Sequence, residues 1–253
     1  MLVELDLDGA VVLVTGGVRG VGLGITRAFL AAGAVVVTCA RRPAEVPGAT
    51  FLPCDVREAD QVSAVMSDVV SRFGRLDVVV NNAGGAPFAL ADRASPRFHS
   101  KIVELNLLAP LLVAQAAFEV MRDSGGSIVN VSSVSGRRPS PGTAAYGAAK
   151  AGLESLTSSL AVEWAPSVRV NALAVGMVRT EQSHLHYGSE AGIEAVARTV
   201  PLGRLATPDE VGACAVFLAS PLASYVTGAT LLVHGGGEVP AFLAASDADG
   251  GSS

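Results

Sequence analysis

Short runs of apolar, mostly β-branched residues alternate along this chain with segments long enough for helices. The runs predict strands at residues 11–15, 35–39, 50–53, 78–80, 127–131, 169–172 and 230–233. The segments between them predict helices at residues 22–32, 58–73, 96–122, 145–163 and 208–218. Strands that alternate with helices form parallel sheets, and strands without polar alternation have both faces covered. The pattern therefore predicts an α/β fold, a doubly wound (Rossmann) parallel seven-stranded sheet with helices on both faces.

The length of 253 residues fits one domain of this kind. We expect a single domain over residues 1–240 and a loose C-terminal tail over residues 241–253. Residues 176–205 form the longest irregular stretch, which predicts a substrate lid or a pair of short helices.

Composition excludes several classes of partner. A net charge of −5 without a basic run argues against nucleic acid and anionic membranes. The sequence contains no run of about 18 uninterrupted apolar residues, so it predicts no membrane span. Its N-terminus lacks the basic region that is typical of a signal peptide. The three cysteines lack metal-site spacing, which predicts reduced thiols and a cytoplasmic protein. His184 and His186 lie in a polar segment, so no metal site is expected, and residues 97–99 are expected at a solvated helix start.

The segment TGGVRGVG, residues 15–22, follows the first predicted strand and opens the first helix. Gly16 allows a tight turn, Gly20 lets the backbone approach a pyrophosphate, and Gly22 lets the helix pack closely on the sheet. The start of a helix also offers unpaired N–H groups and about half a positive charge to phosphate. The segment predicts a dinucleotide-binding loop, with an ordinary strand-to-helix turn as the alternative.

Three further motifs follow in order: NNAG at residues 81–84, IVNVSS at 128–133 and YGAAK at 146–150. Together with the glycine loop they resemble the short-chain dehydrogenase/reductase family over residues 5–237. Within it the chain resembles NADP-preferring members such as 3-oxoacyl-carrier-protein reductases and hydroxysteroid dehydrogenases. The resemblance implies an NADP(H)-dependent oxidoreductase that interconverts a ketone and a secondary alcohol by hydride transfer.

The resemblance also assigns catalytic roles. It implies that Tyr146 transfers the proton, that Ser133 binds the substrate oxygen, and that the backbone of Asn106 holds a water in a proton relay to Lys150. Tyr146 and Lys150 are four residues apart and share one helix face. A cation about 4 Å from the phenol stabilises the phenolate by roughly 4 kcal/mol at a dielectric of about 20. This energy corresponds to about three pKa units, so it could lower the phenol pKa from about 10 to near 7. Desolvation of the phenol opposes this shift. Ser132 is the alternative to Ser133 for binding the substrate oxygen. Because neighbouring residues of a strand face opposite sides of the sheet, only one of the two serines can have this role.

The residues after the second strand bear on the choice of nucleotide. Where NAD-using members carry an acidic residue, this chain has Ala40, followed by Arg41 and Arg42. Arg19 lies on the same side of the glycine loop, and a guanidinium pairs with a phosphate through two hydrogen bonds. These arginines predict a site for the 2′-phosphate of NADP, with exposure to water as the alternative.

The resemblance implies further cofactor contacts. Asp55 would contact the adenine amino group, and Thr180 would hold the nicotinamide carboxamide. The family usually has proline before Gly176, where this chain has Val175, so we expect a less rigid loop beneath the nicotinamide. The complete set of expected cofactor-binding residues is Thr15, Gly16, Arg19, Gly20, Val21, Gly22, Arg41, Arg42, Asp55, Val56, Asn82, Ala83, Gly84, Tyr146, Lys150, Gly176, Val178 and Thr180.

The substrate is less constrained. The segment GGAPFAL at residues 84–90 and the lid predict apolar walls, hence a bulky alicyclic, steroid-like or acyl substrate, with a coenzyme A thioester as one option. Arg137 and Arg138 would attract an anionic substrate group, or alternatively lie in a solvated loop or in an ion pair across a subunit contact.

Two other functions remain open. One is a non-catalytic NADP-binding sensor or scaffold on the same fold, and the other is an NAD-linked alcohol dehydrogenase. The joint presence of Ser133, Tyr146 and Lys150 favours an enzyme with a small-molecule substrate. Apolar faces in residues 96–122 and 145–163, together with the resemblance, predict a homotetramer, with a dimer as the alternative.

Overall fold

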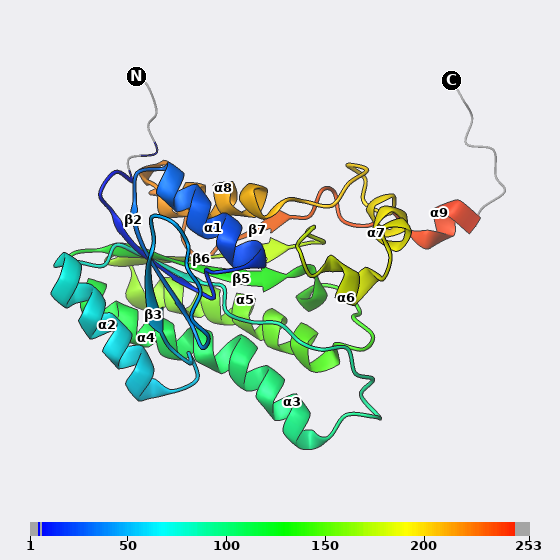
Figure 1. The fold of residues 1–253 in the computed structure, drawn as a ribbon, viewed down its shortest axis with the longest axis horizontal. Helices are drawn as coiled ribbons and strands as arrows, with labels where there is room; N and C mark the ends of the chain where they lie inside the picture. Colours follow the sequence, from blue (N-terminus) through cyan, green and yellow to red (C-terminus); the bar gives the residue numbers. More distant parts are fainter. Residues whose placement is uncertain (1–4, 6, 246–253) are drawn as a thin grey trace.

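The computed structural model describes residues 5 and 7–245 (Figure 1). Within these residues, seven parallel strands form one sheet in the order β3-β2-β1-β4-β5-β6-β7. The strands are β1 Val11–Thr15, β2 Val35–Ala40, β3 Thr50–Pro53, β4 Val78–Asn81, β5 Gly126–Ser133, β6 Val168–Val175 and β7 Thr230–Val233. The chain crosses from β3 back to β4 beside β1, so the predicted doubly wound sheet is confirmed. This switch point is where sheets of this kind bind their ligands.

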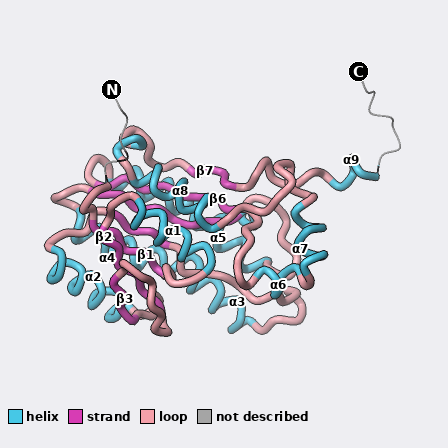
Figure 2. Tube along the Cα trace, turned by 45° about the horizontal axis from the view of Figure 1, so that its top comes forward, coloured by secondary structure: helices cyan, strands magenta, loops and turns pink. Residues whose placement is uncertain are grey.

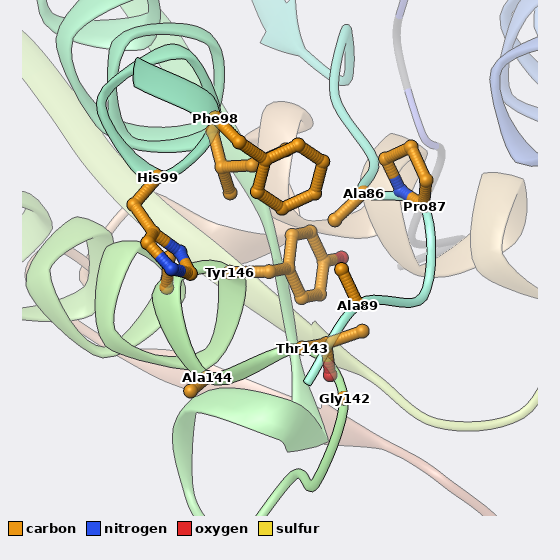
Figure 3. A pocket seen from close by; sticks show the side chains of 11 residues that line it. Ala86, Pro87, Ala89, Phe98, His99, Gly142, Thr143, Ala144 and Tyr146 are labelled. Carbon is orange, nitrogen blue, oxygen red and sulfur yellow. The ribbon is translucent and has the colours of Figure 1, made fainter. Parts of the chain in front are cut away.

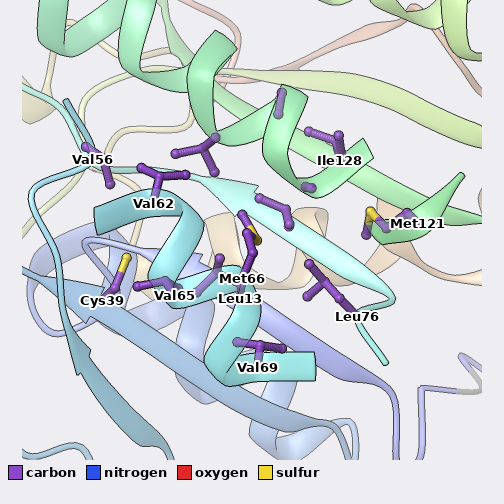
Figure 4. Packing of buried hydrophobic residues seen from close by; sticks show 14 of the residues in the cluster. Leu13, Cys39, Val56, Val62, Val65, Met66, Val69, Leu76, Met121 and Ile128 are labelled. Carbon is purple, nitrogen blue, oxygen red and sulfur yellow. The ribbon is translucent and has the colours of Figure 1, made fainter. Parts of the chain in front are cut away.

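Helices cover both faces of the sheet, as the uninterrupted apolar strands require (Figure 1). On one face, Val12 and Val14 pack with α1 Gly20–Ala31 and α8 Pro208–Ala219. On the other face, Val11 and Leu13 pack with α2 Ala59–Phe73, α4 Ala109–Met121 and α5 Ala144–Trp164 (Figure 4). Alternate residues of one strand thus feed two separate cores, because successive side chains point to opposite faces.

The predicted helix at residues 96–122 is interrupted. The structure has α3 Pro96–Val103, one π-helical turn at Glu104–Leu108, and then α4. Pro110 lacks an N–H group, so the carbonyl of Asn106, four residues earlier, has no α-helical donor. By length and composition Pro96–Met121 could span a membrane, but in this domain it is a core helix whose Val113, Ala114 and Ala117 are buried against the sheet.

Strands β5 and β6 run further than the apolar pattern predicted. The sequence pattern ended them at residues 131 and 172, whereas they end at Ser133 and Val175, which pair with each other. Strand β5 continues through two serines because the Ser132 hydroxyl finds hydrogen-bond partners on α5. The extension carries Ser133 to the carboxyl edge of the sheet.

The segment 176–205 contains two short helices, α6 Ser183–Tyr187 and α7 Glu190–Ala197, beyond the carboxyl ends of β5 and β6 (Figure 2). A parallel bridge between Val178 and Ala206 joins the two stems of this segment. Ile193, Val200 and Leu205 form a small core of its own. The segment is therefore folded rather than irregular.

The expected loose tail begins with an ordered element. Ala241–Ala245 forms the short helix α9, which projects from the body of the domain (Figures 1 and 2). The rest of the expected tail, residues 246–253, lies outside the described residues.

Candidate active site

Thr15 fastens the glycine loop to the end of β4. Its hydroxyl accepts hydrogen bonds from the N–H groups of Asn82 and Ala83, both at 3.0 Å, and donates to the carbonyl of Val80 at 3.3 Å. The Asn82 amide in turn donates to the carbonyls of Thr15 at 3.0 Å and Gly16 at 3.2 Å. The motifs TGGVRGVG and NNAG, distant in the sequence, therefore form one rigid floor.

Glycine is required at three points of this floor. A Cβ on Gly22 would lie 2.2 Å from the Gly16 carbonyl oxygen, and one on Gly16, whose φ is 65°, would lie 3.1 Å from the Ala83 Cα. A Cβ on Gly84 would lie 2.7 Å from Asn106 Oδ1 and 3.5 Å from the Lys150 amine. Helix α1 begins at Gly20, so its first N–H groups open onto the same space. The missing Cβ atoms therefore keep open a cradle between the start of α1 and the Lys150 amine.

The end of this cradle beside β2 is cationic. Ala40 ends β2, and Arg41 and Arg42 follow it at the surface. Arg19, the residue before α1, is also exposed. Within residues 5 and 7–245, none of these three arginines has a salt-bridge partner. No carboxylate within the described residues forms a salt bridge with these arginines, although Asp55 is close enough to Arg41 for their charges to interact.

Asp55 is held by a residue that the sequence analysis did not single out. Arg57 donates from Nε to Asp55 Oδ1 at 2.9 Å and from Nη2 to Oδ2 at 2.5 Å. The hydrogen bonds from Arg57 hold the pKa of the Asp55 carboxyl below its ordinary value, and the charge of Arg41 contributes to the same shift. The Asp-x-Arg spacing was the only sequence signal for this bidentate pair, which orients Asp55 next to the cationic end.

Ser133, Tyr146 and Lys150 meet at the carboxyl end of β5. Ser133 is the last residue of that strand, and the other two lie one turn apart on α5. The Lys150 amine donates to the carbonyl of Val131 at 2.8 Å and lies 5.6 Å from the centre of the Tyr146 ring. The hydroxyl of Ser133 hydrogen-bonds to Tyr146. Helix α5 thus places the phenol against the strand that carries the serine.

Ser132 faces away from this group. Its hydroxyl lies 3.2 Å from the carbonyl oxygen of Lys150 and donates to Glu154 Oε1 at 2.9 Å. Because neighbouring strand residues point to opposite sides, the same geometry that turns Ser132 toward α5 turns Ser133 toward Tyr146.

Burial dominates the electrostatics of the pair. Desolvation raises the pKa of Tyr146, and the hydrogen bond from Ser133 lowers it by a smaller amount. Desolvation also lowers the pKa of Lys150 to about 8. The expected lowering of the Tyr146 pKa by Lys150 is absent, because the amine is bonded to the Val131 carbonyl and the half-buried phenol is desolvated.

Asn106 is fully buried in the π-helical turn. Its Oδ1 accepts from the Gly85 N–H at 2.8 Å, and its amide donates to the carbonyls of Gly85 at 3.0 Å and Ile102 at 2.9 Å. The Asn106 side chain therefore holds the loop after β4 in place. Because Pro110 has no N–H to donate, the backbone carbonyl of Asn106 lacks its α-helical donor and could take part in a relay to Lys150.

The segment 176–205, which was expected to form a lid, contacts the glycine loop through the Gly20 N–H, which donates to Glu181 Oε1 at 3.2 Å. The Gly176 N–H donates to the Val233 carbonyl at 2.9 Å, and Val175 is buried between Ser133 and Val233 in the sheet. The Thr180 N–H donates to Ser183 Oγ at 2.9 Å, which orders the start of α6. Despite the missing proline, the start of this loop is held on both sides by strand pairing.

A small pocket lies beside the Tyr146 ring (Figure 3). Its walls come from the loop after β4, the first turn of α3 and the segment that enters α5. Phe98 and His99 line it, although the sequence placed residues 97–99 at a solvated helix start. Only the folding of α3 over α5 brings these two side chains to the pocket.

Arg137 and Arg138 are both paired within the chain. Arg137 lies 2.7 Å from Glu154 Oε2, and Arg138 lies 2.5 Å from Glu238 Oε1. The carboxylates already satisfy the charges that were expected to attract an anionic substrate. The pairing favours the ion-pair alternative, with the partners in the same chain rather than across a subunit contact.

Comparisons with known proteins agree with this geometry. A family model described as enoyl-(acyl carrier protein) reductase matches residues 16–238. The chain is 41% identical to L-fucose dehydrogenase of Oryctolagus cuniculus, over 91% of this chain and 86% of that protein. It is 35% identical to galactitol 2-dehydrogenase of Agrobacterium fabrum, over 92% of this chain and 98% of that protein.

The fold is also that of a solved dehydrogenase. The structure of Thermoplasma acidophilum aldohexose dehydrogenase superimposes with a TM-score of 0.89 at 30% identity, covering 99% of this chain and 100% of that one. These relatives are named for sugars and a sugar alcohol, rather than for the steroids or acyl thioesters expected from the motifs. With the glycine loop, the Ser133–Tyr146–Lys150 cluster and these matches, the chain belongs to the short-chain dehydrogenase/reductase family of nicotinamide-dependent oxidoreductases.

Proposed function

We propose that this protein interconverts a secondary hydroxyl and a ketone on a sugar or sugar alcohol, with NADP(H) as the preferred cofactor. The observation that carries the proposal is the meeting of Ser133, Tyr146 and Lys150 beside the cradle at Gly84. A bound nicotinamide ring would supply the acceptor or donor of the hydride.

The protein's own residues handle the proton. In the oxidation direction Tyr146 removes the hydroxyl proton of the substrate, and in the reduction direction it returns that proton to the developing alkoxide. Ser133, bonded to the same phenol, holds the substrate oxygen. Below a pH of about 8 Lys150 carries a buried positive charge 5.6 Å from the centre of the Tyr146 ring, from which it exchanges protons with the relay through Asn106. The carbonyl of Val131 holds that charge in place.

The preference for NADP rests on the adenosine end. Arg19, Arg41 and Arg42 are exposed, and no carboxylate follows β2 to accept hydrogen bonds from an unmodified ribose. A phosphate placed there gains charge-assisted hydrogen bonds from the guanidinium groups, and no acidic residue occupies position 40 to repel it.

The substrate class rests on the relatives. L-fucose, galactitol and aldohexoses are polyhydroxylated, and the names of three related proteins refer to them. A second candidate, a bulky apolar alcohol or acyl thioester, is favoured by one observation: Phe88 and Leu90 are exposed in the loop beside the pocket, at 72% and 45%.

A turnover panel separates these options. The protein would be incubated with NADP⁺ or NAD⁺ and with L-fucose, other aldohexoses, galactitol, a hydroxysteroid and a 3-hydroxyacyl thioester, and reduced cofactor would be followed by absorbance. We expect turnover of a sugar or alditol with NADP⁺, and none in the Tyr146→Phe variant. Turnover of only the steroid or thioester would transfer the assignment to the second candidate. Cofactor binding without turnover of any substrate would favour a binding protein.

A further inference from the structure

The carboxylate of Glu154 connects three elements of the site. It lies on α5, which carries Tyr146 and Lys150, and it contacts both the end of β5 and the turn after that strand. Glu154 lies on α5, one turn after Lys150, and its side chain is only 13% exposed. One oxygen accepts the hydroxyl hydrogen of Ser132 at 2.9 Å, and the other lies 2.7 Å from the Arg137 guanidinium. Ser132 is the residue before Ser133, which ends β5, and Arg137 follows the turn after that strand.

Backbone packing at the same junction leaves little slack. A Cβ on Gly136 would lie 2.7 Å from the Ala151 N atom, and one on Gly147 would lie 2.6 Å from the carbonyl oxygen of Ser135. The turn after β5 therefore rests directly on the first turns of α5. Glu154 is the side chain that ties this turn and the strand end to the helix.

We propose that Glu154 is a positioning residue for the reaction: its carboxylate holds the end of β5 and the following turn against α5 and thereby sets the contact between Ser133 and Tyr146. The inference rests on the proposed function for its kinetic consequence only. In this proposal Arg137 helps to position the catalytic residues through its ion pair with Glu154 and does not bind a charged group of the substrate.

Glu154 acts here through geometry rather than through the charge of Lys150. The pKa of Lys150 is lowered by burial alone, with no contribution from a carboxylate. A loss of the Glu154 bridge is therefore expected to move the serine and the tyrosine relative to each other. Catalysis is sensitive to such movement, since a displacement of about 1 Å can cost roughly 100-fold in rate.

The experiment compares Glu154→Ala, which removes both contacts, with Glu154→Gln, which keeps an acceptor for Ser132 but loses the ion pair. Glu163→Ala is the matched control, because Glu163 is exposed on the same helix and has no salt bridge within the described residues. We expect kcat to fall roughly 10- to 100-fold in Glu154→Ala and less in Glu154→Gln. Cofactor affinity, measured by fluorescence titration, should stay within about twofold of the parent in every variant.

Exchanging the charges of Arg137 and Glu154 distinguishes the loss of their ion pair from a general folding defect. Arg137→Glu and Glu154→Arg should each lower kcat, and the double variant should recover most of the loss, because the ion pair is restored in reverse. Equal losses in the single and double variants, or equal losses in Glu154→Ala and Glu163→Ala, would overturn the proposal.

A second readout needs no substrate. The protein has three tyrosines, so ¹³C-labelled tyrosine gives three NMR signals, and Tyr146→Phe identifies one of them. Since the Ser133 hydrogen bond lowers the pKa of Tyr146, its loss in Glu154→Ala should raise the pH at which Tyr146 titrates, with the exposed Tyr225 as the internal reference. An unchanged Tyr146 midpoint would overturn the proposal. If the parent turns over no sugar, alditol or other alcohol, the proposed function fails while this measurement still decides the role of Glu154.

Discussion

The amine of Lys150 donates a 2.8 Å hydrogen bond to the carbonyl oxygen of Val131, so that the helix carrying Tyr146 is fastened to the strand carrying Ser133. The bond accounts for a lysine that is 3% exposed in an otherwise apolar layer. It also fixes the amine beside Gly84, where a Cβ would lie 3.5 Å from it.

Replacing Tyr146 by phenylalanine removes the proton-transfer group and nothing else from the site. We expect turnover to fall by at least roughly 100-fold, the usual contribution of a positioned acid or base, while cofactor still binds. Steady-state rates and fluorescence titration measure the two effects. Tyr225→Phe, at a fully exposed position, is the control. A Tyr146→Phe rate within tenfold of the parent would contradict the assignment.

The buried charge of Lys150 should cost stability in a defined pH window. Burial lowers its pKa from 10.5 to about 8, so the unfolded chain binds more protons between these values and folding stability rises with pH there. In Lys150→Met the cost is absent. Urea unfolding should therefore show that the free energy of unfolding of the parent, relative to that of Lys150→Met, rises by roughly 2 kcal/mol between pH 7 and pH 9.5. A difference that stays constant over this range would show that Lys150 is not desolvated as described.

Arg41→Ala should weaken NADPH binding selectively. The loss of one charge-assisted contact to a phosphate is worth roughly 1.5–3 kcal/mol, or about 10- to 100-fold in affinity. NADH binding should be unaffected, because it lacks the 2′-phosphate. Titration of both cofactors, with Arg27→Ala on the exposed side of α1 as control, tests this. Equal or tighter binding of NADH by the parent protein would refute the NADP preference.

Asn106→Ala should destabilise the fold as well as the site. The substitution removes three hydrogen bonds made by a fully buried side chain, to Gly85 N–H, the Gly85 carbonyl and the Ile102 carbonyl, each of which contributes roughly 0.5–1.5 kcal/mol. Urea unfolding should show the loss, whereas Gln115→Ala, exposed on α4, should be close to neutral. Parent-like stability of Asn106→Ala would mean that the clamp on Gly85 is not formed in solution.

The protein is expected to form a homotetramer. Leu108, in the π-helical turn before α4, and Val162, on α5, are 52% and 81% exposed, and apolar area of this kind is seldom left to water. Light scattering at micromolar concentration should give four times the chain mass, and Val162→Glu should shift the population to smaller species. A monomeric parent protein would contradict the expectation.

The sequence alone determined the architecture and the inventory of the site. Apolar β-branched runs and helix-length spacers predict a parallel sheet because each strand must bury both faces. The glycines at residues 16, 20 and 22 predict the loop because Gly16 and Gly20 have positive φ and a Cβ on Gly22 would collide with the nearby Gly16 carbonyl. Such signals act over a few residues, and for this reason they can be read from the sequence.

The tertiary structure decided how those residues work together. It turned Ser132 toward Glu154 and Ser133 toward Tyr146, and it paired Arg137 with a carboxylate 17 positions away on α5. It also reversed the expected direction of the Tyr146 pKa, since burial outweighs any charge that the local Tyr-x-x-x-Lys spacing brings near. These outcomes depend on desolvation and on contacts between distant segments. No local pattern encodes either quantity, because both arise only when β5, the turn after it and α5 are packed against one another.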